Sequence, residues 1–140
     1  MATGFPSHGG LLRAHREGQI LCVEGSGATN LEGAQAYLEA LAPMVAELKG
    51  SRWAVLGVSD SEALLTPEAE QRMTAAAPTL TAMGRVAVAI VLPETPVGSI
   101  MRSQWSRVYA DAGCALAFFD RIADATQWLM ANLEGSASAP

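Results

Sequence analysis

Residues 86–92 read Val-Ala-Val-Ala-Ile-Val-Leu, the longest uninterrupted apolar run in the chain. A run of this kind, rich in β-branched side chains, is typical of a strand that is covered on both faces. Its seven residues are far fewer than the roughly 20 that a membrane-spanning helix needs. We therefore expect residues 86–92 to form a central strand of a sheet with helices packed on both sides.

Shorter strand patterns alternate with helical ones along the rest of the chain. Further strands are expected at 11–17, 19–24, 52–58 and 114–119. Between and after them, apolar residues recur every three or four positions, which predicts helices over 31–49, 67–83, 96–112 and 121–134. Asn30, Thr66, Thr95 and Asp120 precede these helices and are expected to cap them. Pro43 and Pro78 fall inside two of the helices and are expected to bend them.

This order of elements defines the fold class. Alternation of strand and helix favours right-handed crossovers and parallel strands. We expect an α/β fold with a mainly parallel five-stranded sheet, an N-terminal antiparallel hairpin at its edge, and four helices on its faces. The domain is expected to span 8–134 as a single unit, with flexible tails at 1–7 and 135–140.

The charge balance limits the partners that the chain can have. Half of its 140 residues are hydrophobic, and 9 basic residues against 14 acidic ones give a net charge of −5. This balance speaks against nucleic-acid binding and against a polybasic membrane contact. The N-terminus has no signal-peptide pattern, so we expect a cytoplasmic protein without membrane insertion. The low share of charged residues, 16%, favours self-association, and we expect a homodimer.

Polar side chains follow several of the expected strands, where α/β proteins commonly bind ligands. A small apolar ligand at this rim would meet residues from three loops: Ser26, Gly27, Asp60, Ser61, Glu94 and Thr95. Residues 25–30, Gly-Ser-Gly-Ala-Thr-Asn, also leave open a nucleotide or flavin site. They lack the third glycine of the dinucleotide fingerprint and the lysine of a phosphate-binding loop.

No set of residues indicates a catalytic centre or a bound metal. His15, Cys22 and Cys114 show no ligand spacing, so no metal site and no cofactor are expected, and both cysteines are interpreted as reduced core residues. Trp105 and Tyr109 lie one helical turn apart, with Arg102 beside them. They either pack on the sheet or form the lip of an apolar pocket or a face for a protein partner.

Two phrases carry a resemblance to a known family. Residues 84–88 read Gly-Arg-Val-Ala-Val, and Phe118-Phe119-Asp120 leads to Ala-Thr-Gln-Trp-Leu at 125–129. With the order of elements, they resemble the STAS domain of sulfate transporters and anti-sigma-factor antagonists, in particular its small sporulation-antagonist-like relatives in bacteria. The resemblance implies a domain without enzymatic activity. It also implies a phosphorylation switch at the start of the second helix, which falls on Thr66, although the residues around Thr66 differ from the family's Asp-Ser-Ser-Gly.

Taken together, these features predict a binding or regulatory module rather than an enzyme. It would act through a regulatory protein partner or a small apolar, lipid-like ligand. The alternatives are a nucleotide- or flavin-binding protein that uses the 25–30 loop, and an antagonist that is switched by phosphorylation at Thr66.

Overall fold

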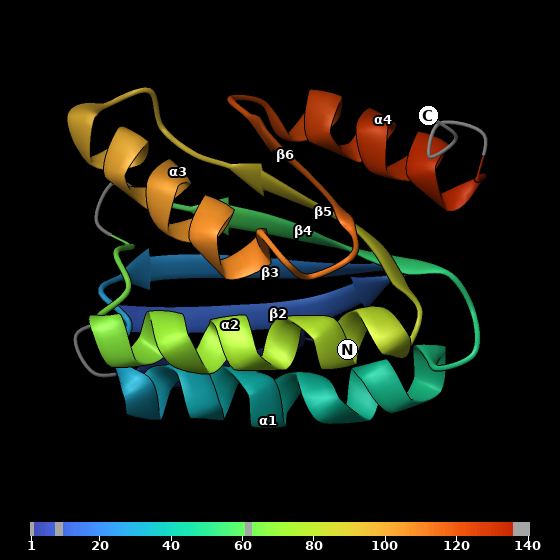
Figure 1. Ribbon diagram of the computed structural model, residues 1–140, viewed down its shortest axis with the longest axis horizontal. Coiled ribbons are helices and arrows are strands. Elements are labelled where there is room, and N and C mark those ends of the chain that lie inside the picture. Colours follow the sequence, from blue (N-terminus) through green and yellow to red (C-terminus); the bar gives the residue numbers. More distant parts are fainter. Residues whose placement is uncertain (1, 8–9, 61–62, 136–140) are drawn as a thin grey trace.

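The computed structural model of the protein describes residues 2–7, 10–60 and 63–135, with side chains from residue 13 on. In this described part, strands and helices follow one another as the sequence predicts (Figure 1). The elements are β1 (Ala2–Ser7), β2 (Gly10–Glu17), β3 (Ile20–Gly27), α1 (Leu31–Leu48), β4 (Trp53–Ser59), α2 (Pro67–Ala82), β5 (Arg85–Val91), α3 (Pro96–Tyr109), β6 (Ala115–Phe119) and α4 (Ile122–Leu133).

All the described strands form one mixed sheet in chain order, β1-β2-β3-β4-β5-β6. The β2–β3 hairpin is antiparallel, and β3, β4, β5 and β6 run parallel, which confirms the predicted fold class. The sheet has one strand more than predicted, because β1 pairs with β2 across residues expected in a tail. An edge strand needs only one hydrogen-bonding neighbour and tolerates Pro6, so its sequence carries little strand signal.

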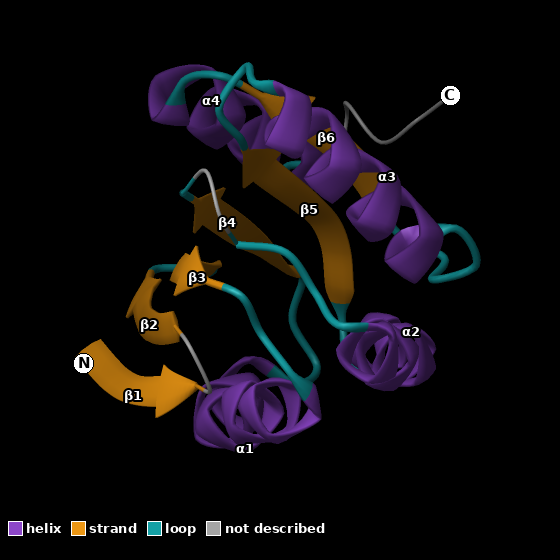
Figure 2. Ribbon diagram, turned by 90° about the vertical axis from the view of Figure 1, so that its left-hand side faces the viewer, coloured by secondary structure: helices purple, strands orange, loops and turns teal. Residues whose placement is uncertain are grey.

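The helices cover both faces of the sheet unequally. Parallel strands in chain order, joined by crossovers of one hand, must place their connecting helices on the same face. Accordingly α1, α2 and α3 lie on one face, and α4, which follows the last strand, lies on the other (Figure 2). Figure 1 shows α1 and α2 running side by side along the sheet, where they contact each other.

The strand residues alternate between two cores. In β4, Trp53 and Val55 point to the α1–α3 face, whereas Ala54 points to α4. In β5, Ala87 and Ala89 point to α4, and both are fully buried. These small side chains let α4 pack closely on the sheet, while the larger ones fill the wider α1–α3 side.

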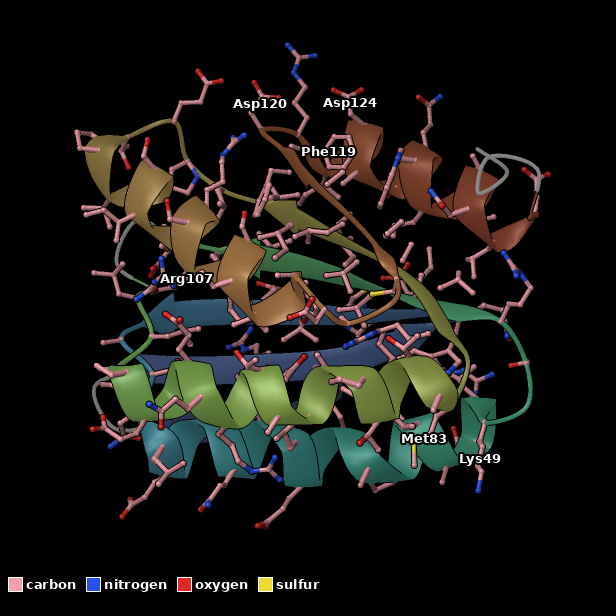
Figure 3. The ribbon with its side chains drawn as sticks, viewed as in Figure 1. Lys49, Met83, Arg107, Phe119, Asp120 and Asp124 are labelled. Carbon is pink, nitrogen blue, oxygen red and sulfur yellow. The ribbon has the colours of Figure 1, made fainter. Side chains whose placement is uncertain are left out.

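The helix boundaries follow the predicted caps in three of four cases. The side chains of Asn30, Thr66 and Thr95 each accept a backbone N–H from the first turn of their helix. The prediction for Asp120 is wrong, because α4 begins after Arg121 and has no side-chain cap hydrogen bond. Asp120 lies at the N-terminal end of α4 without this bond (Figure 3), and Asp124 supplies the acidic group of the first turn.

Candidate ligand-binding pocket

A cavity of about 70 Å³ lies between the sheet and helices α1, α2 and α3, near the carboxyl ends of β3, β4 and β5. Apolar side chains from all these elements line most of it. The lining residues are Val23, Gly25, Thr29, Ala34, Tyr37, Val55, Gly57, Val58, Ser59, Ala63, Leu65, Met73, Val88, Ile90, Trp105 and Tyr109. The cavity therefore lies between the sheet and the three helices, and it reaches the rim at Gly25 and Ser59.

Two loops that meet over the cavity contribute residues to its lining. Thr29 and Leu65 form an isolated parallel β-bridge, and the Thr66 N–H donates to the Thr29 carbonyl over 2.9 Å. On the other side of this bridge, Gln104 of α3 both accepts the Leu65 N–H and donates to the Leu65 carbonyl, each over 2.9 Å. These bonds tie the β3–α1 loop, the β4–α2 loop and α3 together.

Aromatic side chains form the wall of the cavity on the α3 side. The Trp105 and Tyr109 rings stack with their centroids 6.0 Å apart. Within the part of the chain that the structure describes, the buried Trp105 Nε1–H has no hydrogen-bond partner. Buried indole N–H groups usually find an acceptor, and an unmet donor costs about 1–3 kcal/mol. Trp105, whose side chain lines the cavity, therefore carries one buried hydrogen-bond donor for which no described residue supplies an acceptor.

A buried arginine, Arg85, packs against the Tyr109 ring. Arg85 is only 3% exposed, and its guanidinium carbon lies 5.1 Å from the centre of the Tyr109 ring. Its Nη2 donates to the Ala77 carbonyl over 2.9 Å, while its buried Nε has no partner among the described residues. Burial raises the pKa of Tyr109, an effect that Arg85 partly offsets, and burial likewise raises the pKa of Tyr37. Both phenols are therefore neutral at physiological pH.

The residues predicted at the rim separate into two surface depressions. Ser26 and Asp60 line the first, of about 280 Å³, together with Arg13 and Glu24. The Gly27 N–H beside it donates to an Asp60 carboxylate oxygen over 3.4 Å. Ser61 lies outside the described residues.

Glu94 and Thr95 line the second depression, of about 420 Å³, together with Arg102. Asp60 and Glu94 thus face different hollows. The Thr95 hydroxyl oxygen accepts the Gly98 N–H as a helix cap, and Arg102 lies over the Phe118 ring with its guanidinium carbon 5.0 Å from the ring centre. Of the three α3 residues singled out in the sequence, Trp105 and Tyr109 therefore line the cavity and Arg102 does not.

The possible phosphorylation residue, Thr66, caps α2. Its hydroxyl oxygen accepts the Ala69 N–H over 3.2 Å, and its side chain is partly exposed. Both cysteines are free thiols. Burial raises the pKa of the Cys22 thiol to about 11, with a smaller contribution from the Glu17 carboxylate beside it.

Sequence reasoning missed several residues of the cavity, above all Tyr37 and Gly57. Tyr37 lies on the predicted inner side of α1, but its spacing does not distinguish a core residue from one beside a cavity. Gly57 carried a clearer signal, because a glycine inside a strand often marks a place where space is needed next to the backbone.

None of the described helices is long and apolar enough to cross a membrane. Comparisons of the chain with protein-family models, with curated proteins and with solved structures find no match.

Proposed function

We propose that the protein is a non-enzymatic binding module that holds a small apolar ligand, carrying one hydrogen-bond acceptor, in the cavity under α1, α2 and α3. The observation that carries the proposal is that Trp105 lines this apolar cavity and that its buried Nε1–H has no partner among the described residues. A carbonyl or ether oxygen would accept this bond, while the rest of the ligand would replace empty space beside Val55, Val88 and Ile90. A binding role of this kind agrees with the resemblance of the sequence to STAS domains.

The size of the cavity favours this ligand class over a nucleotide or flavin. Its 70 Å³ exceed the roughly 10–15 Å³ that one water molecule requires. They fall well below the roughly 300–1,000 Å³ of pockets for drug-sized ligands. A ring or the end of an alkyl chain fits this space, whereas a dinucleotide would have to lie on the surface.

A matched pair of small probes tests the proposal. Acetophenone and ethylbenzene have nearly the same shape, but only acetophenone carries a carbonyl oxygen. We expect acetophenone to bind about tenfold more tightly, because it satisfies the buried donor. Two-dimensional NMR of the indole N–H groups would follow Trp105 directly, and Trp53 and Trp128 would serve as internal references.

Three variants connect the result to the cavity. Trp105→Phe removes the donor and should abolish the preference for acetophenone. Trp128→Phe is its matched control, because Trp128 packs against Phe119 on the α4 side of the sheet. Gly57→Val places a side chain in the cavity and should prevent both probes from binding. Equal affinities for the two probes in the unaltered protein, or undiminished binding to Gly57→Val, would exclude the proposal.

We further propose that the protein self-associates, as its composition suggests. Ile122 and Met130 of α4 are about half exposed and offer apolar contact area on the outer side of the molecule. The two free thiols agree with a reducing, cytoplasmic environment. Size-exclusion chromatography with light scattering tests the association, and a monomer at high protein concentration would disprove it.

A further inference from the structure

The β2–β3 hairpin brings three metal-ligating side chains together. Antiparallel pairing sets His15 opposite Cys22, and Glu17 follows two residues after His15, on the same face of the sheet. His15 Nε2 lies 2.6 Å from Glu17 Oε2, and Cys22 Sγ lies 3.6 Å from the same oxygen. The three ligand atoms all lie within 4.8 Å of one another.

These side chains are a suitable set for zinc. An imidazole nitrogen, a thiolate sulfur and a carboxylate oxygen are the protein ligands that Zn²⁺ takes, at about 2.0–2.3 Å each. The carboxylate and the thiolate together carry two negative charges, which balance those of the ion. The Cys22 S–H donates to Glu17 Oε2, and His15 Nε2 lies within hydrogen-bond distance of the same oxygen. The Cys22 proton thus lies between two of the atoms that a cation would bridge.

The surroundings allow this geometry to adjust. Tetrahedral coordination requires ligand atoms about 3.3–3.6 Å apart, so the His15–Glu17 pair must open by about 1 Å. The Glu17 side chain is 68% exposed and can rotate, while Cys22 is held in the sheet and is 9% exposed. Gly18, with φ +60°, begins the turn immediately after Glu17 and fixes where the two strands reverse.

The site is also accessible. His15, Glu17 and Cys22 lie on the face of the sheet that carries α4, but α4 packs against β4, β5 and β6. Figure 2 shows β2 toward the opposite end of the sheet from these strands. Solvent therefore reaches the hairpin and can provide the fourth ligand, as in zinc sites with three protein ligands.

We propose that His15, Glu17 and Cys22 form a three-ligand site for Zn²⁺, with water in the fourth position. On binding, the Cys22 thiol releases its proton to solvent. A neutral imidazole carries its proton on Nδ1 and binds the ion through Nε2. The register of the hairpin creates this site, which is independent of the cavity beneath α1–α3.

Cobalt titration of the reduced, tag-free full-length chain tests the site, because a thiolate bound to Co²⁺ gives a charge-transfer absorption band. We expect a saturable band at one ion per chain that Zn²⁺ displaces. Cys22→Ser should remove the band. Cys114→Ser is the matched control and should keep it, because Cys114 packs with the α1–α3 core.

His15→Gln and Glu17→Gln should each weaken Zn²⁺ binding at least about tenfold, as measured by calorimetry. These two side chains are partly or largely exposed, so both variants remain informative even if Cys22→Ser does not fold. The proposal fails if no thiolate band forms, if the band depends on Cys114, or if neither exposed-site variant changes the affinity.

Discussion

Replacing Gly57 by alanine should stabilise the protein, since it adds a methyl group where the fold has left space. Gly57 lies in β4 opposite Ile90 of β5, and it lines the cavity. A Cβ atom at this position would lie 3.8 Å from Ile90 Cγ1 and 3.9 Å from the Ala89 carbonyl oxygen. Both distances are ordinary van der Waals contacts, so the new methyl group would pack without displacing its neighbours.

The expected gain has two sources. Glycine-to-alanine changes at compatible positions stabilise by about 0.4–1 kcal/mol, because they restrict the unfolded chain. Burying one methyl group contributes about 0.8 kcal/mol. The total of about 1–2 kcal/mol should raise Tm by about 3–7 °C, given an unfolding entropy of about 2.1 cal/mol/K per residue.

Urea and thermal denaturation of ligand-free protein, followed by circular dichroism, would measure this gain. Gly98→Ala is the matched control, because it is the same chemical change at another glycine. A Cβ at Gly98 would overlap the Pro93 carbonyl oxygen, so this variant should lose stability. If Gly57→Ala were destabilising, or if the two variants behaved alike, the geometry of the cavity described here would be wrong.

Three further changes test other parts of the structure. Thr66→Ala should cost about 1 kcal/mol in urea denaturation through loss of the α2 cap, whereas Thr66→Ser should retain most of the stability. Arg107 of α3, labelled in Figure 3, donates two 2.8 Å hydrogen bonds to the Glu70 carboxylate of α2, and these bonds lower the pKa of Glu70. Their stabilisation is complete above the ordinary glutamate pKa of about 4.3 and is lost as pH falls through the lowered pKa. The Tm difference between the unaltered protein and Glu70→Gln should therefore be present at pH 7 and vanish in acid, and a constant difference would contradict the pairing. Among the described residues no carboxylate pairs with Arg85. Arg85→Met should therefore leave the free energy of unfolding unchanged or raise it by about 1 kcal/mol. Calorimetric melting measures this change, and a lower Tm in the variant would contradict the prediction.

Much of the architecture could be predicted because its signals are local. Residues 86–92 indicated a covered strand, and β5 lies between β4 and β6 with helices on both faces. Asn30, Thr66 and Thr95 were correctly predicted as caps, since a cap depends on its own side chain and on N–H groups within three residues. The cap prediction for Asp120 is wrong because α4 starts one residue later than predicted, which puts Arg121 at the cap position.

The candidate sites could be predicted only in part. Trp105 and Tyr109 stood out because aromatic residues one turn apart share a helix face. Tyr37 of α1 and Gly57 of β4 line the same cavity. Their spacing along the chain does not predict that they lie close to Trp105 and Tyr109. Similarly, His15 and Cys22 show no metal-ligand spacing, and only the hairpin register sets them opposite each other.

The amino-acid sequence alone determined the strands and helices from β2 to α4 and the order in which they follow. These properties depend on side-chain periodicity and on hydrogen bonds between near neighbours in the chain. Tertiary structure alone decided that β1 joins the sheet, that a cavity remains between the sheet and three helices, and that the side chains of His15, Glu17 and Cys22 meet on one hairpin. These features depend on strand register and on how side chains from distant segments fill a shared volume, which no local stretch of sequence specifies.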